Sequence, residues 1–308
     1  MVKEGLFLPD SQSERGPVYT MWVASNWKDY QLLDCGGGKR YERWGKQYLV
    51  RPDPQAIWAP ARKWDRVNAV YHRSSTGGGS WEVFSLPDSW QISYKKLVFN
   101  IKPMSFKHTG VFPEQGANWD FITERIGHRL RGGGEQPSVL NLFAYTGGAT
   151  MAAAAAGARV CHVDASKGMV SWAKENARSS GLGDAPIRYI VDDCIKFVKR
   201  EINRGHKYDA IIMDPPSYGR GPSGEVWRFE ENIDDFVGLC GQLLSDTPLF
   251  VLISSYTAGV SPSVPAYILS RTVASRFGGH TEADELGLEV TSTGLALPCG
   301  HASRWMGE

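Results

Sequence analysis

The sequence has few cysteines, and they are not arranged for a disulfide framework or a metal site. Five cysteines are spread over 308 residues, and no two of them form a C-x-x-C pair. An odd, widely spaced set argues against a structural zinc site and against a disulfide-stabilised scaffold. Free thiols and no bound metal are therefore expected.

Long apolar runs are also missing. No stretch approaches the roughly 18 apolar residues that a membrane helix needs. The N-terminal MVKEGLFLPDSQSERGP has no apolar core of the kind found in signal peptides. These absences argue against a membrane protein and predict a cytoplasmic one. Nothing in the sequence indicates an oligomeric state.

A third absence concerns phosphate recognition. The classical dinucleotide pattern G-x-G-x-x-G is absent from the glycine-containing segment Asn141–Gly148, so a dinucleotide cofactor is not indicated. What is present is an ordinary globular composition, with 42% hydrophobic and 22% charged residues. At roughly 100–200 residues per domain, the length predicts two domains.

The charge is distributed unevenly, although the formal net charge is only +1. Residues 1–110 hold 16 Lys/Arg against 10 Asp/Glu, whereas residues 111–308 hold 18 against 23. A basic N-terminal part suggests contact with a polyanion. A solvated basic surface without a partner explains the charge equally well.

The first hundred residues are rich in strand formers and turn residues. Alternating apolar runs predict strands at residues 30–35, 47–51, 80–84, 90–94 and 97–101. We therefore expect a small β-rich domain over residues 1–105, with RNA binding as its candidate role. The run from Lys39 to Lys46 interleaves charged and aromatic residues, which indicates either an RNA contact or an exposed strand surface.

From about residue 119 the pattern changes to alternating strands and helices. Helices are predicted at residues 120–130, 149–156, 167–180, 194–204 and 232–244, and strands at 138–143, 159–163, 187–191, 208–213 and 249–253. This alternation implies a mostly parallel sheet with helices on both faces. The sequence thus predicts a Rossmann-like α/β domain over residues 106–308. Residues 288–290 and 295–297 could supply edge strands.

Two motifs follow the first two strands of this domain. Asn141–Gly148 reads N-L-F-A-Y-T-G-G and lies where open parallel sheets bind ligands. Gly147 and Gly148 would let the backbone approach a ligand, unless the motif is only a tight turn. Asp164 ends the second strand, where a carboxylate can accept hydrogen bonds from both hydroxyls of a ribose. Its alternative role is a helix N-cap, although Ser166 could serve instead.

Two further motifs follow the third and fourth strands. Asp193 could hold the exocyclic amine of an adenine, or it could cap the next helix. Asp214-Pro-Pro-Ser-Tyr218 is the most specific pattern, because two prolines stiffen the backbone and remove two N–H donors. Asp214 and the freed carbonyls could accept hydrogen bonds from a planar base on which Tyr218 stacks. The alternative is a rigid turn.

A polar and aromatic segment, Lys107–Trp119, precedes the sheet and is either a cover over the ligand or a linker. With this segment upstream, the motifs N-L-F-A-Y-T-G-G, V-D-A-S and D-P-P-S-Y occur in an order that resembles one family. Residues 106–260 resemble the bacterial class I methyltransferases that act on large-subunit ribosomal RNA, which include cytosine carbon-5 and guanine nitrogen-7 enzymes.

The resemblance implies S-adenosylmethionine as methyl donor and a nucleobase, in ribosomal RNA, as acceptor. Asp214, Pro215 and Tyr218 are expected at the reacting atoms. The positions that the resemblance assigns to the cofactor are Phe112, Gln115, Asn118, Phe143, Tyr145, Gly147, Asp164, Ala165, Asp193, Cys194 and Asp214.

Two departures from the family pattern bear on the chemistry. The upstream segment reads G-V-F-P-E-Q-G, so its acid is Glu114 and the usual arginine is missing. Cytosine carbon-5 methylation needs a thiolate nucleophile, but Ser255 occupies the position of that cysteine. Cys299, far from Ser255 in the sequence, is the alternative candidate for this nucleophile. If no thiolate is used, a nitrogen atom is favoured as the methyl acceptor. The alternatives are a small-molecule or protein acceptor, or a non-catalytic module that binds the cofactor.

Overall fold

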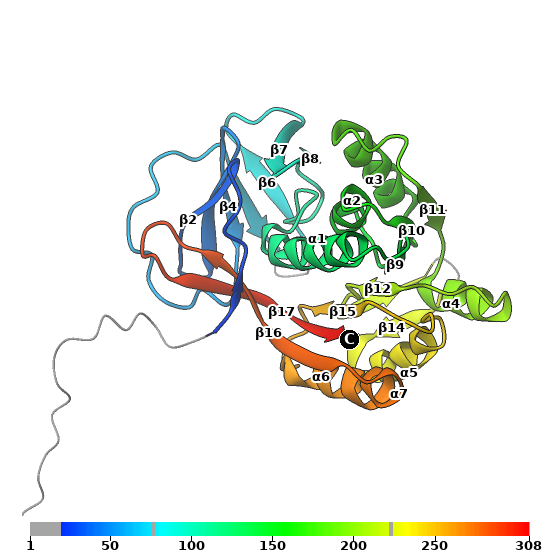
Figure 1. The fold of residues 1–308 in the computed structure, drawn as a ribbon. Coiled ribbons are helices and arrows are strands. Elements are labelled where there is room, and N and C mark those ends of the chain that lie inside the picture. Colours follow the sequence, from blue (N-terminus) through cyan, green and yellow to red (C-terminus); the bar gives the residue numbers. More distant parts are fainter. Residues whose placement is uncertain (1–19, 75–77, 222–223, 308) are drawn as a thin grey trace, which may run out of the picture.

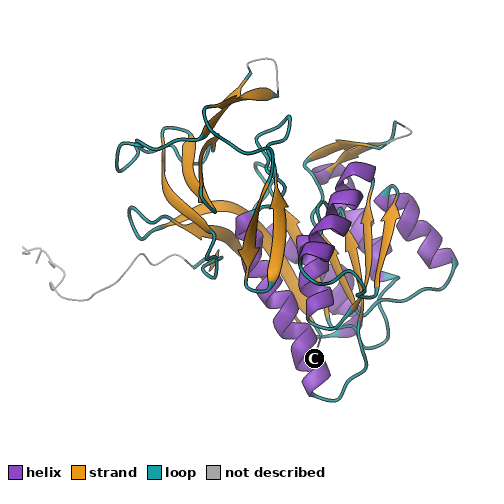
Figure 2. Cartoon of the chain, turned by 90° about the horizontal axis from the view of Figure 1, so that it is seen from above, coloured by secondary structure: helices purple, strands orange, loops and turns teal. Residues whose placement is uncertain are grey.

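The computed structural model describes residues 20–74, 78–221 and 224–307. The N-terminal stretch that was searched for a signal peptide lies outside these residues. A β-rich half and an α/β half lie beside each other in Figure 1. The view in Figure 2 shows that the helices gather in the α/β half.

The α/β half is built on an eight-stranded sheet of order β1-β16-β17-β15-β12-β9-β10-β11. Its strands are β1 (Trp22–Val23), β9 (Ser138–Leu142), β10 (Arg159–Asp164), β11 (Ile187–Val191), β12 (Ala210–Met213), β15 (Phe250–Ser255), β16 (His280–Glu289) and β17 (Ala296–Met306). The chain passes from β9 through β10 to β11 and then returns to β12 on the other side of β9. This return creates a topological switch point between β9 and β12, where open α/β sheets bind ligands.

All neighbouring strands from β15 to β11 are parallel, which confirms the predicted fold class. The long hairpin of β16 and β17 differs from the prediction. Residues 288–290 and 295–297 contribute to its turn end, and β17 is antiparallel to both β15 and β16. β17 lies between β15 and β16 along residues 301–306, whereas residues 296 and 297 pair with β16 beyond the last residue that pairs with β15.

Helices cover both faces of this sheet because successive strand residues point to opposite sides. Val139 and Ile212 join a core with α1 and α2, whereas Leu140 and Ile211 join a core with α4, α5 and α6. The helical elements are η1 (Pro113–Gln115), α1 (Gly116–Arg131), α2 (Gly148–Ala155), α3 (Lys167–Ser179), α4 (Cys194–Asn203), α5 (Phe229–Gly241), α6 (Ser263–Leu269), η2 (Ser270–Ala274) and α7 (Ser275–Phe277).

The β-rich half holds a five-stranded sheet of order β2-β3-β4-β5-β6 and a separate hairpin. These strands are β2 (Tyr30–Gly36), β3 (Lys39–Trp44), β4 (Gln47–Pro52), β5 (Ala69–Arg73) and β6 (Gly79–Val83), with β7 (Trp90–Tyr94) and β8 (Leu97–Ile101) in the hairpin. A further small hairpin, β13 (Tyr218–Arg220) and β14 (Val226–Arg228), follows β12. The five strands predicted for this half are present, whereas β3 and β5 were not predicted.

Strand β3 corrects the interpretation of the Lys39–Lys46 run. Arg40, Tyr41, Glu42 and Trp44 are buried, so the run is not a solvated strand surface along its length. Its charged and aromatic side chains instead form much of the interior of the small sheet.

The two halves are joined by segments from both ends of the described chain. β1 pairs in parallel with β16 of the large sheet. At the tip of the β16–β17 hairpin, Thr291 N donates to Leu32 O at 2.9 Å and Ser292 Oγ donates to Asp34 Oδ1 at 2.7 Å. The orange and red hairpin in Figure 1 accordingly reaches from the α/β half to the blue sheet.

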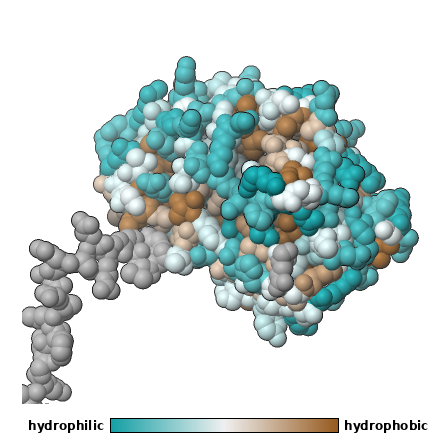
Figure 3. All heavy atoms as spheres, viewed as in Figure 1, coloured by the Kyte–Doolittle hydropathy of each residue, from teal (hydrophilic) through white to brown (hydrophobic). Residues whose placement is uncertain are grey.

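The surface is mixed in character. Hydrophilic residues predominate on the face shown in Figure 3, and smaller hydrophobic areas interrupt them. Among the described residues, no helix combines the length and apolar character needed to cross a membrane.

Candidate functional site

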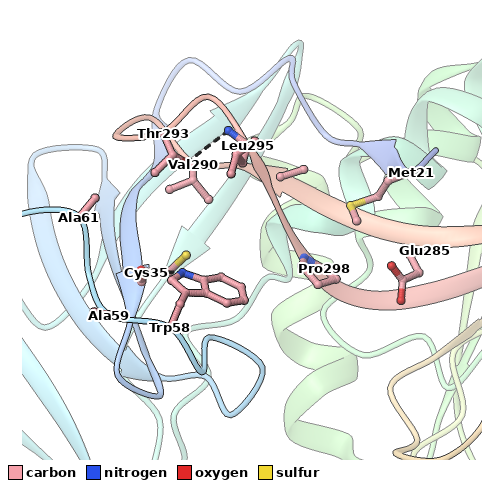
Figure 4. A pocket seen from close by; sticks show the side chains of 11 residues that line it. Met21, Cys35, Trp58, Ala59, Ala61, Glu285, Val290, Thr293, Leu295 and Pro298 are labelled. Carbon is pink, nitrogen blue, oxygen red and sulfur yellow. Dashed lines mark hydrogen bonds between the residues drawn. The ribbon is translucent and has the colours of Figure 1, made fainter. Parts of the chain in front are cut away.

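Two hollows flank the β16–β17 hairpin, and they differ in chemistry. The smaller one, of about 400 Å³, is lined mainly by apolar side chains such as Met21, Trp58 and Leu295 (Figure 4). Glu285 is the one charged residue in its described lining, and this residue also borders the larger hollow. The larger cavity, of about 1130 Å³, has carboxylates, cations and aromatic rings on its walls. It is therefore the candidate active site.

The larger cavity opens at the carboxyl ends of the parallel strands. Phe143, Asp164, Asp193, Asp214 and Tyr256 line it, and each of them ends or closely follows one of the strands β9, β10, β11, β12 or β15. The predicted motifs therefore meet at one place because parallel strands present the same ends at one edge.

The turn after β9 has unusual backbone geometry. Phe143 and Tyr145 have φ angles of 53° and 50°, in the left-handed region that bulky residues rarely adopt. Phe143 N donates to Cys194 Sγ at 3.3 Å, and Tyr145 N donates to Asp164 Oδ2 at 2.8 Å. Such strain persists only where the surroundings enforce it, and it is concentrated at functional sites.

The two glycines of this turn have a packing role. A Cβ at Gly147, where φ is 86°, would lie 3.0 Å from Ala173 Cβ, and a Cβ at Gly148 would lie 2.6 Å from Trp119 Cζ2. Neither glycine is among the residues that line the cavity. Close helix packing therefore explains why side chains are absent at both positions.

Asp164 and Ala165 lie on the cavity wall at the end of β10. The Asp164 carboxylate accepts hydrogen bonds from Tyr145 N and Ser166 N, both at 2.8 Å. A carboxylate has about four acceptor positions, so others remain for a ligand. Burial raises the pKa of Asp164, which makes an additional hydrogen-bond donor favourable. Ser166 is the N-cap of α3, so the capping role considered for Asp164 belongs to Ser166.

Asp193 and Cys194 line the wall at the end of β11. Asp193 Oδ1 accepts from Lys196 N at 2.9 Å, so the side chain is the N-cap of α4. Asp193 therefore has the helix-capping role that was considered from the sequence. This position also places its carboxylate beside the cavity.

Asp214 lies at the end of β12, and its environment changes its acidity. Burial raises the pKa of its carboxyl to about 7, and the charge of Glu114 acts in the same direction. Gln115 Nε2 lies 3.4 Å from Asp214 Oδ2 and donates to Tyr256 Oη at 2.9 Å. A carboxyl that titrates near neutral pH inside a cavity is a functional-site candidate.

The residues after Asp214 are arranged differently from the prediction. Pro215 and Pro216 line the cavity, but the Pro216 carbonyl already accepts from Trp227 Nε1 at 2.7 Å. Tyr218 is 51% exposed and is not among the lining residues. The rings on the cavity wall are instead those of Phe112, Phe143, Tyr145, Trp227 and Tyr256.

The upstream segment Lys107–Trp119 contains residues that line the cavity and buried residues that support the lining. Phe112 lines the cavity, with its ring centroid 5.5 Å from that of Tyr145. Gln115 and Asn118 are buried and are not lining residues. Asn118 Nδ2 donates to Gln115 Oε1 at 2.9 Å, so these two amides form a support that leads to Asp214.

Gly116 follows the support at the position where the resemblance predicts an arginine. A Cβ at Gly116 would lie 3.0 Å from Tyr94 Cε2. The close packing of the Tyr94 ring therefore explains why a long side chain is absent.

The opposite wall was predicted only in part, since Lys107 and His108 belong to the segment considered as a cover and Arg40 to the run considered as an RNA contact. Arg40, Asp53, Arg73, Lys107 and His108 line it, and all of them come from the β-rich half or from the segment that follows it. Burial lowers the pKa of Lys107 to about 8 and that of His108 to about 4, and neighbouring arginines act in the same direction. The charged and aromatic run around Arg40 was a signal, but alternation along β3 does not reveal which face of the strand is buried.

The two candidate nucleophiles from the sequence also border the cavity. Ser255 Oγ accepts from Thr257 N at 3.2 Å. Burial raises the pKa of the Cys299 thiol well above its usual value, and Glu114 raises it further. Cys299 is only partly buried on the cavity wall, and a thiol that stays neutral is a poor nucleophile.

Known proteins share both sequence and fold with this chain. A model of S-adenosylmethionine-dependent methyltransferases matches residues 49–230. The Ribosomal RNA large subunit methyltransferase K/L of Shewanella frigidimarina is 36% identical over 128 residues, which cover 41% of this chain and 18% of that protein. The match thus spans less than a fifth of the length of this curated relative.

Solved structures extend the likeness to nearly the whole chain. The SAM Dependent Methyltransferase from Agrobacterium tumefaciens has a TM-score of 0.88 and 34% identity, and the match covers 95% of each chain. SMU.776, solved as a complex with SAH, has a TM-score of 0.67 at 17% identity and covers 92% of this chain and 76% of that one. The second likeness concerns the fold alone.

Proposed function

The chain belongs to the S-adenosylmethionine-dependent methyltransferase family, and from this premise we propose that it methylates a nucleobase of ribosomal RNA. The predicted enzyme class and cofactor are confirmed by this membership. The RNA acceptor is supported by the names of the curated relatives. It is also supported by the cations that the N-terminal sheet presents to the cavity. An RNA substrate places the proposed activity in the cytoplasm.

The observation that carries the proposal is the single cavity in which both sets of residues meet. Asp164, Asp193 and Asp214 line it from the strand ends, and Arg40 and Lys107 line it from the other side. We divide the roles accordingly. Residues 106–308 hold the cofactor and the reacting atoms, while residues 1–105 contribute contacts to the acceptor.

The strand-end side of the cavity fits S-adenosylmethionine. Asp164 retains acceptor positions for ribose hydroxyls, and Asp193 and Cys194 would flank the adenine. Phe112, Phe143 and Tyr145 would surround the methionine part, and Ala165 lies beside Asp164. Gly147 would act through its backbone, and Gln115 and Asn118 through Asp214. When bound, S-adenosylmethionine supplies an electrophilic methyl group.

Asp214 would position the acceptor. Because its pKa is about 7, the carboxyl can accept a hydrogen bond from an acceptor N–H and take up its proton near neutral pH. Pro215 adds no N–H donor that would compete for Asp214. The Gln115 amide keeps Asp214 oriented. Holding the acceptor nitrogen in line with the transferred group would supply most of the catalysis.

The test is transfer of tritiated methyl groups from S-adenosylmethionine to deproteinised ribosomal RNA. We expect the wild type to label large-subunit RNA and Asp214→Ala to be at least about a hundredfold slower. Asp184→Ala removes an exposed aspartate from the loop before β11 and should match the wild type. Digestion to nucleosides then identifies the methylated atom. Cofactor binding without label in RNA would refute naked ribosomal RNA as substrate and favour a small-molecule or protein acceptor.

A further inference from the structure

Arg40 is a buried cation with unsatisfied hydrogen-bonding capacity on the acceptor side of the cavity. It lies on β3, is 7% exposed and lines the cavity. Its Nε and Nη1 atoms are buried and have no hydrogen-bond partner among the described residues. Two carboxylate oxygens lie near Arg40 Nε and balance its charge. Asp53 Oδ2 is 3.4 Å away and Glu42 Oε1 is 3.9 Å away. Buried donors without partners are costly, so their presence in a cavity indicates a ligand that completes them.

Glu114 is a second such group, with the opposite hydrogen-bonding character. It belongs to η1, is 1% exposed and lines the same cavity. Its Oε2 atom is buried and, within the part of the chain that the structure describes, has no hydrogen-bond partner. It directly precedes Gln115, the residue that contacts Asp214. The unpaired carboxylate oxygen of Glu114 is therefore at the end of the cavity where the base that receives the methyl group must react.

The electrostatics of this end agree with the geometry. The negative charge of Glu114 raises the pKa values of Arg40, Asp214, Tyr256 and Cys299. In each case burial or another nearby charge has a larger effect than Glu114. Glu114 is thus close to all of these groups. The ion pairs of Arg40 go to Glu42 and Asp53, and within the described part of the chain none joins Arg40 to Glu114. The two groups do not neutralise each other by direct contact.

We propose that Arg40 and Glu114 recognise the acceptor base by its lactam edge, that is, a ring carbonyl next to a ring N–H. The guanidinium only donates, and a carboxylate only accepts. A ligand that satisfies both must present an acceptor to Arg40 and a donor to Glu114. Guanine, hypoxanthine and uracil have such an edge, whereas adenine and cytosine present an amino donor next to a bare ring nitrogen. This inference rests on the proposed function, in which the acceptor is an RNA base.

Matched nucleosides test this edge directly, without turnover. The full chain, saturated with S-adenosylhomocysteine, is titrated with inosine against adenosine and with uridine against cytidine, and binding is followed by NMR. The members of each pair differ only at the edge in question. Within each pair we expect the wild type to bind the lactam member about tenfold or more tightly, because a site with buried polar groups rejects the mismatched analogue.

Three variants separate recognition from folding. Glu114→Gln keeps the size of the side chain but introduces a donor, and Arg40→Lys keeps the charge but loses the planar fork. Both should reduce the preference within each pair to less than about threefold, mainly by weakening the lactam member. Arg43→Gln alters the next arginine of β3, which is not a lining residue and bonds to Gln31 and backbone carbonyls. It should keep the wild-type preference. Thermal denaturation of each variant confirms that it is folded.

Several outcomes would overturn the inference. They are equal binding within each pair by the wild type, no binding of any of the four nucleosides, and an unchanged preference in both Glu114→Gln and Arg40→Lys. A preference for adenosine and cytidine would overturn it as well. A clear lactam preference without methyl transfer to ribosomal RNA would instead refute the proposed RNA substrate and leave the recognition pair standing.

Discussion

The two sheets of this protein place polar residues in opposite ways. In the large sheet, the central strands are mostly apolar, as in Ala210–Met213 of β12, and most of the chemistry follows the strand ends. In the small sheet, charged residues lie within the strands themselves, with Glu42 fully buried in β3 and Arg51 buried in β4. Both sheets contribute to one cavity. The large sheet contributes mainly residues at or after its strand ends, whereas the small sheet contributes side chains of residues within its strands.

The charged interior of the small sheet is a connected network. Arg51 donates to both oxygens of Glu42, at 2.6 and 2.7 Å, and Tyr30 donates to Glu42 at 2.8 Å. The arginines hold the pKa of Glu42 below its usual value despite burial. The large sheet thus buries mainly apolar side chains in its central strands, while the small sheet also buries a charged network within its strands.

The most damaging change should therefore be one that breaks this pairing. Glu42→Gln removes the charge but keeps the shape, so Arg51 is left buried without a counter-ion. Breaking a buried pair in this way costs about 3–5 kcal/mol of unfolding free energy. As a comparison from the large sheet, Ile211→Val should cost only about 1 kcal/mol. Urea denaturation measures both, and similar losses in the two variants would contradict the distinction between the sheets.

The second prediction concerns the polar end of the large sheet and its dependence on pH. The pKa of Asp214 is raised from its ordinary 3.8 to about 7. A raised pKa means that the native state holds the proton more tightly than the unfolded chain. The associated stability is complete below about 4 and is lost as the pH rises through about 7.

Asp214→Asn cannot titrate and should avoid this loss. Relative to the wild type, the variant should gain up to about 3 kcal/mol of unfolding free energy between pH 5 and pH 8, since one pKa unit is worth about 1.4 kcal/mol. Denaturation of the cofactor-free protein at both pH values measures the gain. Asp184→Asn, at an exposed position, is the control and should show no such trend. A gain that does not grow with pH would mean that Asp214 is ionised throughout.

The contrast between the sheets also explains what could be predicted from the sequence. In a parallel α/β sheet, every strand ends at the same edge, so Asp164, Asp193 and Asp214 could be placed together without knowing their partners. Strand alternation in the small sheet does not reveal which face is buried. Arg40 and Glu42 were consequently assigned to a surface, although they point inward.

The long C-terminal hairpin was underestimated for a related reason. Only its short apolar stretches at residues 288–290 and 295–297 gave a strand signal. The rest of β16, from His280 to Glu285, is polar and forms a strand because β17 pairs with it. β17 itself is specified by two neighbours, β15 and β16, and such tertiary pairing leaves little trace in local sequence.

The smallest effect is expected at Asp193, where capping and cofactor binding coincide in one carboxylate. Asp193→Ala removes the N-cap of α4 and should cost about 1 kcal/mol of unfolding free energy. Asp193→Ser keeps a capping oxygen and should be close to the wild type in stability. If the carboxylate also holds the adenine amine, both variants should bind S-adenosylmethionine about tenfold more weakly, as for the loss of a hydrogen bond to a charged group. Calorimetric titration of the two variants separates the roles, because unchanged affinity in Asp193→Ser would leave Asp193 as a helix cap that merely borders the site.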